Sequence, residues 1–424
     1  MIKKTTNYVL TLAFLLMVHS TIKKTPDCAE NTVTKISINN LKKKTIIMTK
    51  LLKSIILGMM ISITVCCQNK QQNNMLQNKT NLPEFDWKAN VNCPPGYPVE
   101  VYRGGLEGNG SYASLDSGTA TGKSGWGFSG KDVSYGVKSL PSRINCIWVS
   151  YAEGCFYSID SPIDYDKMLH LFQEGYQNSA FYFNGNGEYK KMTFSTIIVG
   201  FAPGGVVVIW AMGGGRQVEI GRYKGEKYQV SQAEIQRLDS HESLLFSKDE
   251  YKRIMLNTQI VPLEVREANA GKPIPYGLWD SYRVRYTWRS VFAIKKEVEI
   301  TSIICMKYNG EKELIFDKNL AENKFSKQAI PKFANLSWTD WTVNSWTDKK
   351  GQGYGGEITF DEQEITQAYQ EMYKDDKEGQ AELQFSINHI NTFVTVQLKQ
   401  GDKEIRLGKT IVKVYKSKSL SLKK

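Results

Sequence analysis

The chain has 424 residues, of which 41% are hydrophobic, and its 55 lysines and arginines against 43 acidic residues give a formal net charge of +12. Residues 1–66 contain ten of the lysines and two of the acidic residues, so the remainder carries 45 basic against 41 acidic side chains, a balance of +4. A nearly neutral body lacks the basic footprint of a nucleic-acid-binding protein, so we expect no nucleic-acid partner.

An export signal is predicted over residues 48–67. Lys50 and Lys53 precede an uncharged stretch that is shorter than the roughly 20 apolar residues needed to span a bilayer. Bacterial lipoprotein signals end in a cysteine, so we predict lipidation of Cys67, with Cys66 as the alternative. An ordinary secretory signal with incidental cysteines remains open. The expected location is a bacterial cell envelope, where an amino-terminal lipid anchors the protein to the outer membrane, on its periplasmic or surface face.

Residues 1–47 precede this signal and contain a second, weaker apolar run, YVLTLAFLLMV. A misassigned start explains this segment most simply, with Met48 as the initiator, and a real amino-terminal membrane anchor is the alternative. Residues 68–82 follow the signal, and the wealth of glutamine and asparagine among them predicts a flexible tether.

The rest of the chain is predicted to be mainly β or α+β, with antiparallel, sandwich-like sheets and three or four short peripheral helices. We divide it into a principal β-rich domain at 83–295 and a second β-rich unit at 296–424, and leave open whether the second packs on the first. Residues that favour helix N-caps begin four helical patterns, at Asp164, Ser231, Ser247 and Asp361.

The stretch FAPGGVVVIWAMGGGRQVEIGRY, residues 201–223, contains the most conspicuous glycine run. Val206 to Trp210 is apolar on both faces, which predicts a central strand, and Gly213 to Gly215 can reverse the chain. A phosphate-binding loop would need a helix after the glycines, but an alternating strand follows. We therefore predict a hairpin, in which Arg216 and Arg222 are candidate ligand contacts.

Several motifs occur in order: PPGYPVEVYRGGL, SGWG, LPSRINCIWVSYAEGCFY, IIVGFAPGGVVVIWAMGGGRQVEIGRY and RYTWRSVF. Together they resemble an uncharacterised bacterial lipoprotein family of Bacteroidetes-type genomes, the domain of unknown function DUF2931. The resemblance covers most of residues 85–295 and is weak or absent over 296–424. It implies a lipid-anchored protein and brings no catalytic residues, because none are established for the family.

Four cysteines of the body, Cys93, Cys146, Cys155 and Cys305, are disulfide candidates in an exported protein. A hairpin about the turn YAEG would place Cys155 opposite Ser150 and about 13 Å from Cys146, at ~3.4 Å per residue, whereas a disulfide tolerates about 7 Å between Cα atoms. Cys146 and Cys155 are therefore a poor pair, and free buried thiols remain the alternative for all four. No CxxC pair occurs and the histidines lack partners at metal-ligand spacing, so we expect no metal site.

No nucleophile elbow or zinc-protease motif is present, and GTATGKS is one residue too short for a phosphate loop, so we expect no cofactor. Trp338, Trp341 and Trp346 stand in a polar, glycine-rich stretch, where exposed tryptophans would contact a glycan or a protein partner. The alternative is that they cap the core of the second unit.

The functional prediction is a non-enzymatic binding or interaction protein, of which an immunity-type protein that blocks a delivered toxin is one specific version. An envelope hydrolase acting on glycan or lipid is the alternative.

Overall fold

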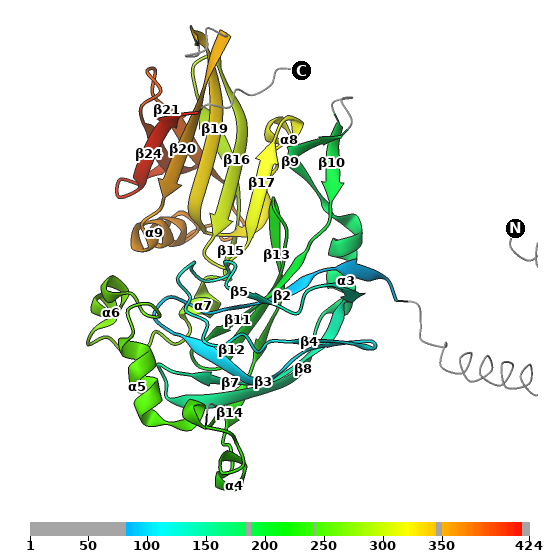
Figure 1. The fold of residues 1–424 in the computed structure, drawn as a ribbon. Coiled ribbons are helices and arrows are strands. Elements are labelled where there is room, and N and C mark those ends of the chain that lie inside the picture. Colours follow the sequence, from blue (N-terminus) through cyan, green and yellow to red (C-terminus); the bar gives the residue numbers. More distant parts are fainter. Residues whose placement is uncertain (1–81, 184–187, 241, 345–349, 418–424) are drawn as a thin grey trace, which may run out of the picture. The chain divides into compact units, whose positions relative to one another are not determined.

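The computed structural model describes residues 82–183, 188–240, 242–344 and 350–417 (Figure 1). The predicted signal with Cys66 and Cys67, the segment before it, nearly all of the tether, and Trp346 lie outside these residues. Within the described residues no helix has the length and apolar character needed to cross a membrane.

The largest sheet has ten strands, and these come from both ends and the middle of the described chain (Figure 1). In spatial order its strands are β24 (Ile411–Lys416), β20 (Lys350–Thr359), β19 (Pro331–Asn344), β16 (Val298–Lys307), β17 (Lys312–Phe316), β13 (Arg216–Lys224), β12 (Val206–Met212), β11 (Thr196–Ala202), β2 (Lys88–Asn92) and β5 (Lys131–Val133). Neighbouring strands of this sheet are antiparallel except β2 and β11, which run parallel.

Two five-stranded sheets pack against this large sheet. The first has the order β14 (Glu226–Tyr228), β8 (Cys155–Pro162), β7 (Pro141–Ser150), β3 (Val99–Gly108) and β4 (Ser111–Ser114). The second has the order β18 (Ser326–Ala329), β15 (Arg285–Ala293), β21 (Ala381–Ile387), β22 (Val394–Gln400) and β23 (Lys403–Arg406). Two short ribbons pair β1 (Glu84–Asp86) with β6 (Val137–Ser139) and β9 (Tyr176–Phe183) with β10 (Glu188–Met192).

Seven α-helices occur in the described residues, together with the 3-10 helix η1 (Glu242–Phe246). They are α3 (Tyr165–Glu174), α4 (Gln232–Ile235), α5 (Lys248–Leu256), α6 (Leu263–Asn269), α7 (Leu278–Ser281), α8 (Lys318–Ala321) and α9 (Glu362–Met372). The mainly β, α+β fold class with antiparallel sheets is thus confirmed, and the four predicted helix starts are correct. The helices α6, α7 and α8 were not predicted, because elements this short leave almost no hydrophobic period in a sequence.

The amino-terminal half of the large sheet has an aliphatic and aromatic core. Every residue of β11 is buried, and so is nearly all of β12, as expected for central strands covered on both faces. Trp148 of β7 packs on Phe201 of β11 with ring centroids 4.7 Å apart, which joins the first five-stranded sheet to the large sheet. Helix α3 adds buried side chains, including Phe172, to the same core.

The carboxy-terminal half has its own core, between β16, β19 and β20 on one side and β15, β21 and β22 on the other. Helix α9 adds a row of buried residues at the helical spacing, and its Tyr369 lies edge-on to Trp288, with ring centroids 6.1 Å apart. Strand β15 precedes the expected boundary at residue 295 but pairs with β18 and β21, which follow it.

The two halves of the large sheet meet at a short ladder between β13 and β17. Only Arg216 with Glu313 and Gln217 with Lys312 are register partners there, among the described residues. The indole N–H of Trp210 donates to the Asn309 carbonyl at 3.0 Å. Ion pairs reinforce the joint, since Arg283 donates to Glu219 at 2.9 Å and Arg285 donates to Glu311 at 2.9 Å.

Candidate functional site

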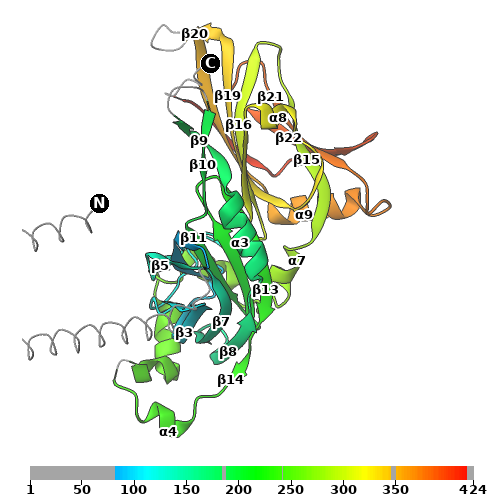
Figure 2. The same ribbon diagram turned by 90° about the vertical axis from the view of Figure 1, so that its right-hand side faces the viewer.

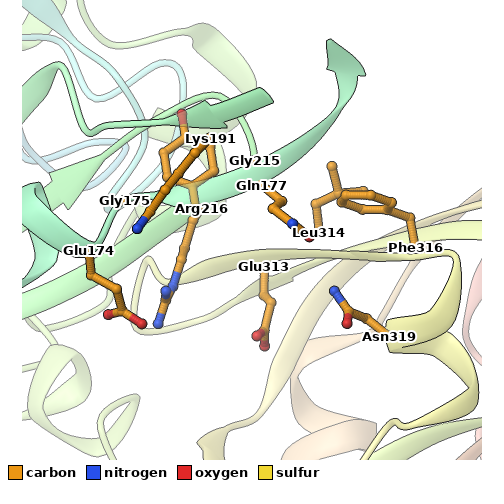
Figure 3. A pocket seen from close by; sticks show the side chains of 11 residues that line it. Glu174, Gly175, Gln177, Lys191, Gly215, Arg216, Glu313, Leu314, Phe316 and Asn319 are labelled. Atoms are coloured by element: carbon orange, nitrogen blue, oxygen red, sulfur yellow. The ribbon is translucent and has the colours of Figure 1, made fainter. Parts of the chain in front are cut away.

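A pocket with a volume of about 480 Å³ lies at this joint (Figure 3). Its walls come from the end of α3, the start of β9, β10, the turn before β13, β17 and α8. The polar side chains among its lining residues are Glu174, Gln177, Lys191, Arg216, Glu313 and Asn319. Pockets of roughly 300–1,000 Å³ are typical of small-molecule sites.

Helix α3 and the β9–β10 hairpin form one wall of the pocket. The helix is held beside β13, because Lys167 Nζ donates to the Ile220 carbonyl at 3.4 Å and Tyr223 accepts from the Asp164 amide at 3.4 Å. Gly175 ends the helix with a φ of +64°, a conformation that favours glycine, and its amide donates to Leu171 O at 2.8 Å. The chain passes from this glycine into the hairpin, whose strands β9 and β10 lie above α3 in Figure 2.

The glycine run adjoins this wall as a hairpin turn that contacts Tyr176. Gly213 N donates to Arg216 O at 2.8 Å, and the Gly214 amide donates to the Tyr176 hydroxyl at 2.7 Å. A Cβ atom on Gly213 would lie 2.2 Å from that hydroxyl, so close approach requires glycine there. Burial raises the pKa of Tyr176, and the amide hydrogen bonds from Gly214 and Gly215 oppose this rise. The glycine run therefore packs against the ring of Tyr176 and is not arranged as a phosphate-binding loop.

The charged residues of the pocket are unequally partnered. Glu174 faces His170 at 3.4 Å, and Glu313 lies 3.8 Å from Lys307. Arg216 is the direct register partner of Glu313, yet among the described residues neither Arg216 nor Lys191 forms an ion pair. In Figure 3 the charged ends of Glu174, Arg216 and Glu313 project to the same side of the strands. The charge left without a partner is positive.

Arg222, the second predicted arginine contact, has a structural role instead. Its guanidinium donates two parallel hydrogen bonds to Asp280, at 2.8 and 2.7 Å, and it does not line the pocket. Such a fork-to-fork pair already gives one edge of the guanidinium a carboxylate partner, the kind of group that a ligand would supply. The expectation for Arg222 is corrected on this geometry.

The predicted tryptophan platform is not assembled in the described residues. Trp338 is 1% exposed, stacks on Tyr354 and donates to Asn391 at 3.0 Å. It is not a ligand contact and belongs to the core of the second unit, as the alternative for these tryptophans stated. Trp341 is half-buried and donates to Glu299 at 3.0 Å. Neither residue lines the pocket.

The four cysteines of the body are free thiols, three of them buried and Cys155 half-buried. Cys155 lies opposite Ser150 in the β7–β8 hairpin, which confirms the register predicted from the turn YAEG. Burial raises the pKa of Cys93 and of Cys305 to about 12, so these thiols stay protonated at neutral pH. In the described part of the chain no three His, Cys, Asp or Glu side chains gather as a metal site requires.

Sequence reasoning identified Arg216 and missed the other polar residues of the pocket. Glu174 and Lys191 each look like ordinary surface charges, and Glu313 lies in a strand whose partner the sequence does not reveal. Glu174 does mark the last turn of a predicted helix, but nothing in the sequence sets it beside Arg216. The pairing of β13 with β17 brings the set together.

Comparison with known proteins supports one part of the resemblance noted from the motifs, the domain of unknown function. Residues 68–277 match the family model described as "Protein of unknown function (DUF2931)". No curated protein and no solved structure matches the chain. The matched range contains Glu174, Gln177, Lys191 and Arg216, whereas β17 and α8 lie beyond it. The pocket thus combines the matched region with the part of the chain that follows it.

Proposed function

We propose that this chain, which carries a domain of unknown function at residues 68–277, is a lipid-anchored binding protein of a bacterial cell envelope, with its binding site at Arg216. The observation that carries the proposal is a guanidinium that lines an open pocket without an ion-pair partner among the described residues. Arginine presents a rigid fork of donors that suits carboxylate and phosphate groups. Glu313 lies opposite Arg216 on the neighbouring strand, but its carboxylate is 3.8 Å from Lys307 and forms no ion pair with Arg216 among the described residues.

The anchoring part of the proposal rests on the sequence. The basic and apolar pattern of residues 48–67 ends at Cys66 and Cys67, and a polar tether follows before the first strand. Changing both cysteines to alanine should release the protein from the membrane fraction and abolish acylation. A double variant that stays membrane-bound and acylated would contradict the anchor.

Two carboxylates in one pocket also suit the alternative, an envelope hydrolase. A glycan hydrolase places two carboxyl groups about 5–9 Å apart across the scissile bond. Glu174 and Glu313 are 51% and 47% exposed, and each faces a basic side chain. A general acid is normally set in more apolar surroundings than these. This favours binding over catalysis.

The test is cross-linking capture in intact cells with three chains: wild type, Arg216→Ala and the control Lys190→Ala. Lys190 is exposed on β10 next to Lys191 but does not line the pocket. We expect the cross-linked species to be lost with Arg216→Ala and kept with the control. Unchanged capture by Arg216→Ala would remove the pocket from the proposal. In the immunity-type version the captured species is a delivered toxin.

The same cells separate binding from hydrolysis. Glu174→Gln and Glu313→Gln keep the shape of each side chain and remove its charge. If either variant stops turnover of an envelope glycan or lipid while the species is still captured, the hydrolase explains the pocket better.

A further inference from the structure

We infer that the pocket binds a zwitterion, an amino acid or short peptide that presents a carboxylate to Arg216 and an ammonium group to Glu313. The inference rests on the proposed function and adds the chemical class of the ligand. It comes from the distribution of charge in the pocket, where two basic and two acidic side chains line one space.

The carboxylate of the ligand belongs with Arg216 and Lys191. Both line the pocket, and neither is neutralised by an acidic side chain in the described residues. A guanidinium binds a carboxylate through two parallel hydrogen bonds, and an ammonium group nearby adds a second positive charge without imposing a direction. A carboxylate therefore matches this side of the pocket.

The ammonium group belongs with Glu313. Residues directly opposite each other on antiparallel strands have Cβ atoms about 4.5–5.5 Å apart, and Arg216 and Glu313 are such a pair. Opposite charges in this position usually interact across the strands, but here no ion pair joins them. Glu313 is 47% exposed, and its contact with Lys307 is long, at 3.8 Å. A small molecule whose two charges are a few bonds apart can contact both strands at once.

The two glutamates also disfavour a dianion. A phosphate monoester carries about −1.5 to −2 charges at pH 7 and would bring them close to Glu174 and Glu313. A zwitterion adds no net charge, so its carboxylate is attracted while its ammonium offsets the acidic side chains. A guanidinium alone would bind a carboxylate or a phosphate. The two glutamates therefore favour the carboxylate of a zwitterion over a phosphate.

The remaining lining residues suit the body of a peptide. Gln177 and Asn319 each offer an amide that both donates and accepts hydrogen bonds, as a peptide bond requires. Leu314, Phe316 and Tyr176 add apolar surface on which a small side chain can pack. A volume of about 480 Å³ leaves room for more than one residue.

Calorimetric titration of the full-length lipidated chain in detergent tests the inference. The probes are alanine, alanyl-alanine, N-acetyl-alanyl-alanine without the ammonium group, alanyl-alanine amide without the carboxylate, and inorganic phosphate. We expect alanine or alanyl-alanine to bind, and each blocked dipeptide to bind at least about tenfold more weakly, since a hydrogen bond to a charged group is worth about 1.5–3 kcal/mol. Comparison of the two zwitterions separates an amino acid from a peptide.

Variants test which side chain binds the carboxylate of the ligand and which binds its ammonium group. Arg216→Ala should weaken the zwitterion about tenfold or more, Arg216→Lys should weaken it less, and Lys190→Ala should leave it unchanged. Glu313→Gln should weaken alanyl-alanine but should not weaken N-acetyl-alanyl-alanine, which has no ammonium group to lose a partner and faces one negative charge less. Circular dichroism of each variant shows whether the fold is kept.

The outcomes separate this inference from the function on which it rests. Binding of phosphate or of the acetylated dipeptide as tight as that of the zwitterion, and lost with Arg216→Ala, overturns the ligand class and leaves the binding pocket in place. No binding of any probe by the wild type overturns the inference. In that case cross-linking capture with Arg216→Ala still decides the proposed function.

Discussion

The two halves of the ten-stranded sheet are built differently. The amino-terminal half has two strands, β11 and β12, that are apolar along almost their whole length, and a sheet that covers them. The carboxy-terminal half has a core to which a helix and a set of tyrosines contribute, and it buries a charged group, Asp340, at 0% exposure. Apolar packing builds each half, whereas arginine–glutamate pairs help to join them. The pocket also lies at this polar joint.

The largest effect should come from breaking one core. Trp148 is fully buried against Phe201, so Trp148→Ala should lower the free energy of unfolding by about 3–5 kcal/mol. Urea unfolding measures the loss, and hydrogen exchange should show more exchange in β7 and β11 than in β21. Phe385→Ala, in the other core, should give the reverse pattern. Equal loss of protection in both halves would mean that the two cores behave as one.

The joint is tested by leaving one buried charge without its partner. The side chain of Glu311 is 10% exposed, and that of Arg285 is 36% exposed. Burial raises the pKa of Glu311, but the hydrogen bond from Arg285 and the nearby positive charges outweigh it and lower the pKa overall. Arg285→Met should therefore cost about 2–4 kcal/mol, because the buried carboxylate of Glu311 loses a hydrogen bond and one of its nearby positive charges.

Adding Glu311→Gln to Arg285→Met should recover part of this stability. Thermal or urea unfolding of the single and double variants measures the difference. A loss of only about 0.5 kcal/mol for Arg285→Met would mean that the pair stabilises the protein no more than an ordinary surface ion pair does. The pair would then not hold the two halves of the sheet together.

A pH dependence should distinguish the carboxy-terminal half. Burial raises the pKa of Asp340, but hydrogen bonds from Lys295, Thr342 and Asn391 outweigh burial and lower the pKa to about 2. Because the folded pKa lies below the ordinary value of 3.8, the stabilisation is present above pH 3.8 and is lost as the pH falls toward 2.

Asp340→Asn should therefore lower the free energy of unfolding by about 1–2 kcal/mol at neutral pH. The difference between wild type and variant should vanish near pH 2, as urea titrations at several pH values would show. A difference that stays constant with pH would assign the effect to packing rather than to charge.

The smallest effect is a difference in thiol reactivity without loss of stability. Iodoacetamide should label half-buried Cys155 first in the folded protein, as mapped by mass spectrometry. The buried thiols should react only when their own half opens, Cys146 in one half and Cys305 in the other. Rapid labelling of Cys305 before Cys155 would contradict the burial on which the comparison of the two cores depends.

The elements of the fold were more predictable than the site. Helix caps, the hairpin at YAEG and the strand at Val206 to Trp210 depend on neighbours in the sequence, and the structure has each of them. The cap at Ser247 is a partial exception, because its side chain accepts no hydrogen bond, while Glu250 pairs with Arg253. Local rules placed the helix correctly but not the contacts of its first turn.

The sequence by itself determined the nearly neutral body, the strand-rich class and the hairpin at the glycine run, because composition, period and turn chemistry are local properties. Only the tertiary structure decided that Arg222 is paired with Asp280, that Trp338 is buried, and that Arg216 lies beside Glu313 in a pocket. These facts depend on which strands and helices become neighbours. The pairing of the elements follows from the packing of two cores against one sheet, and no single stretch of the sequence determines that packing.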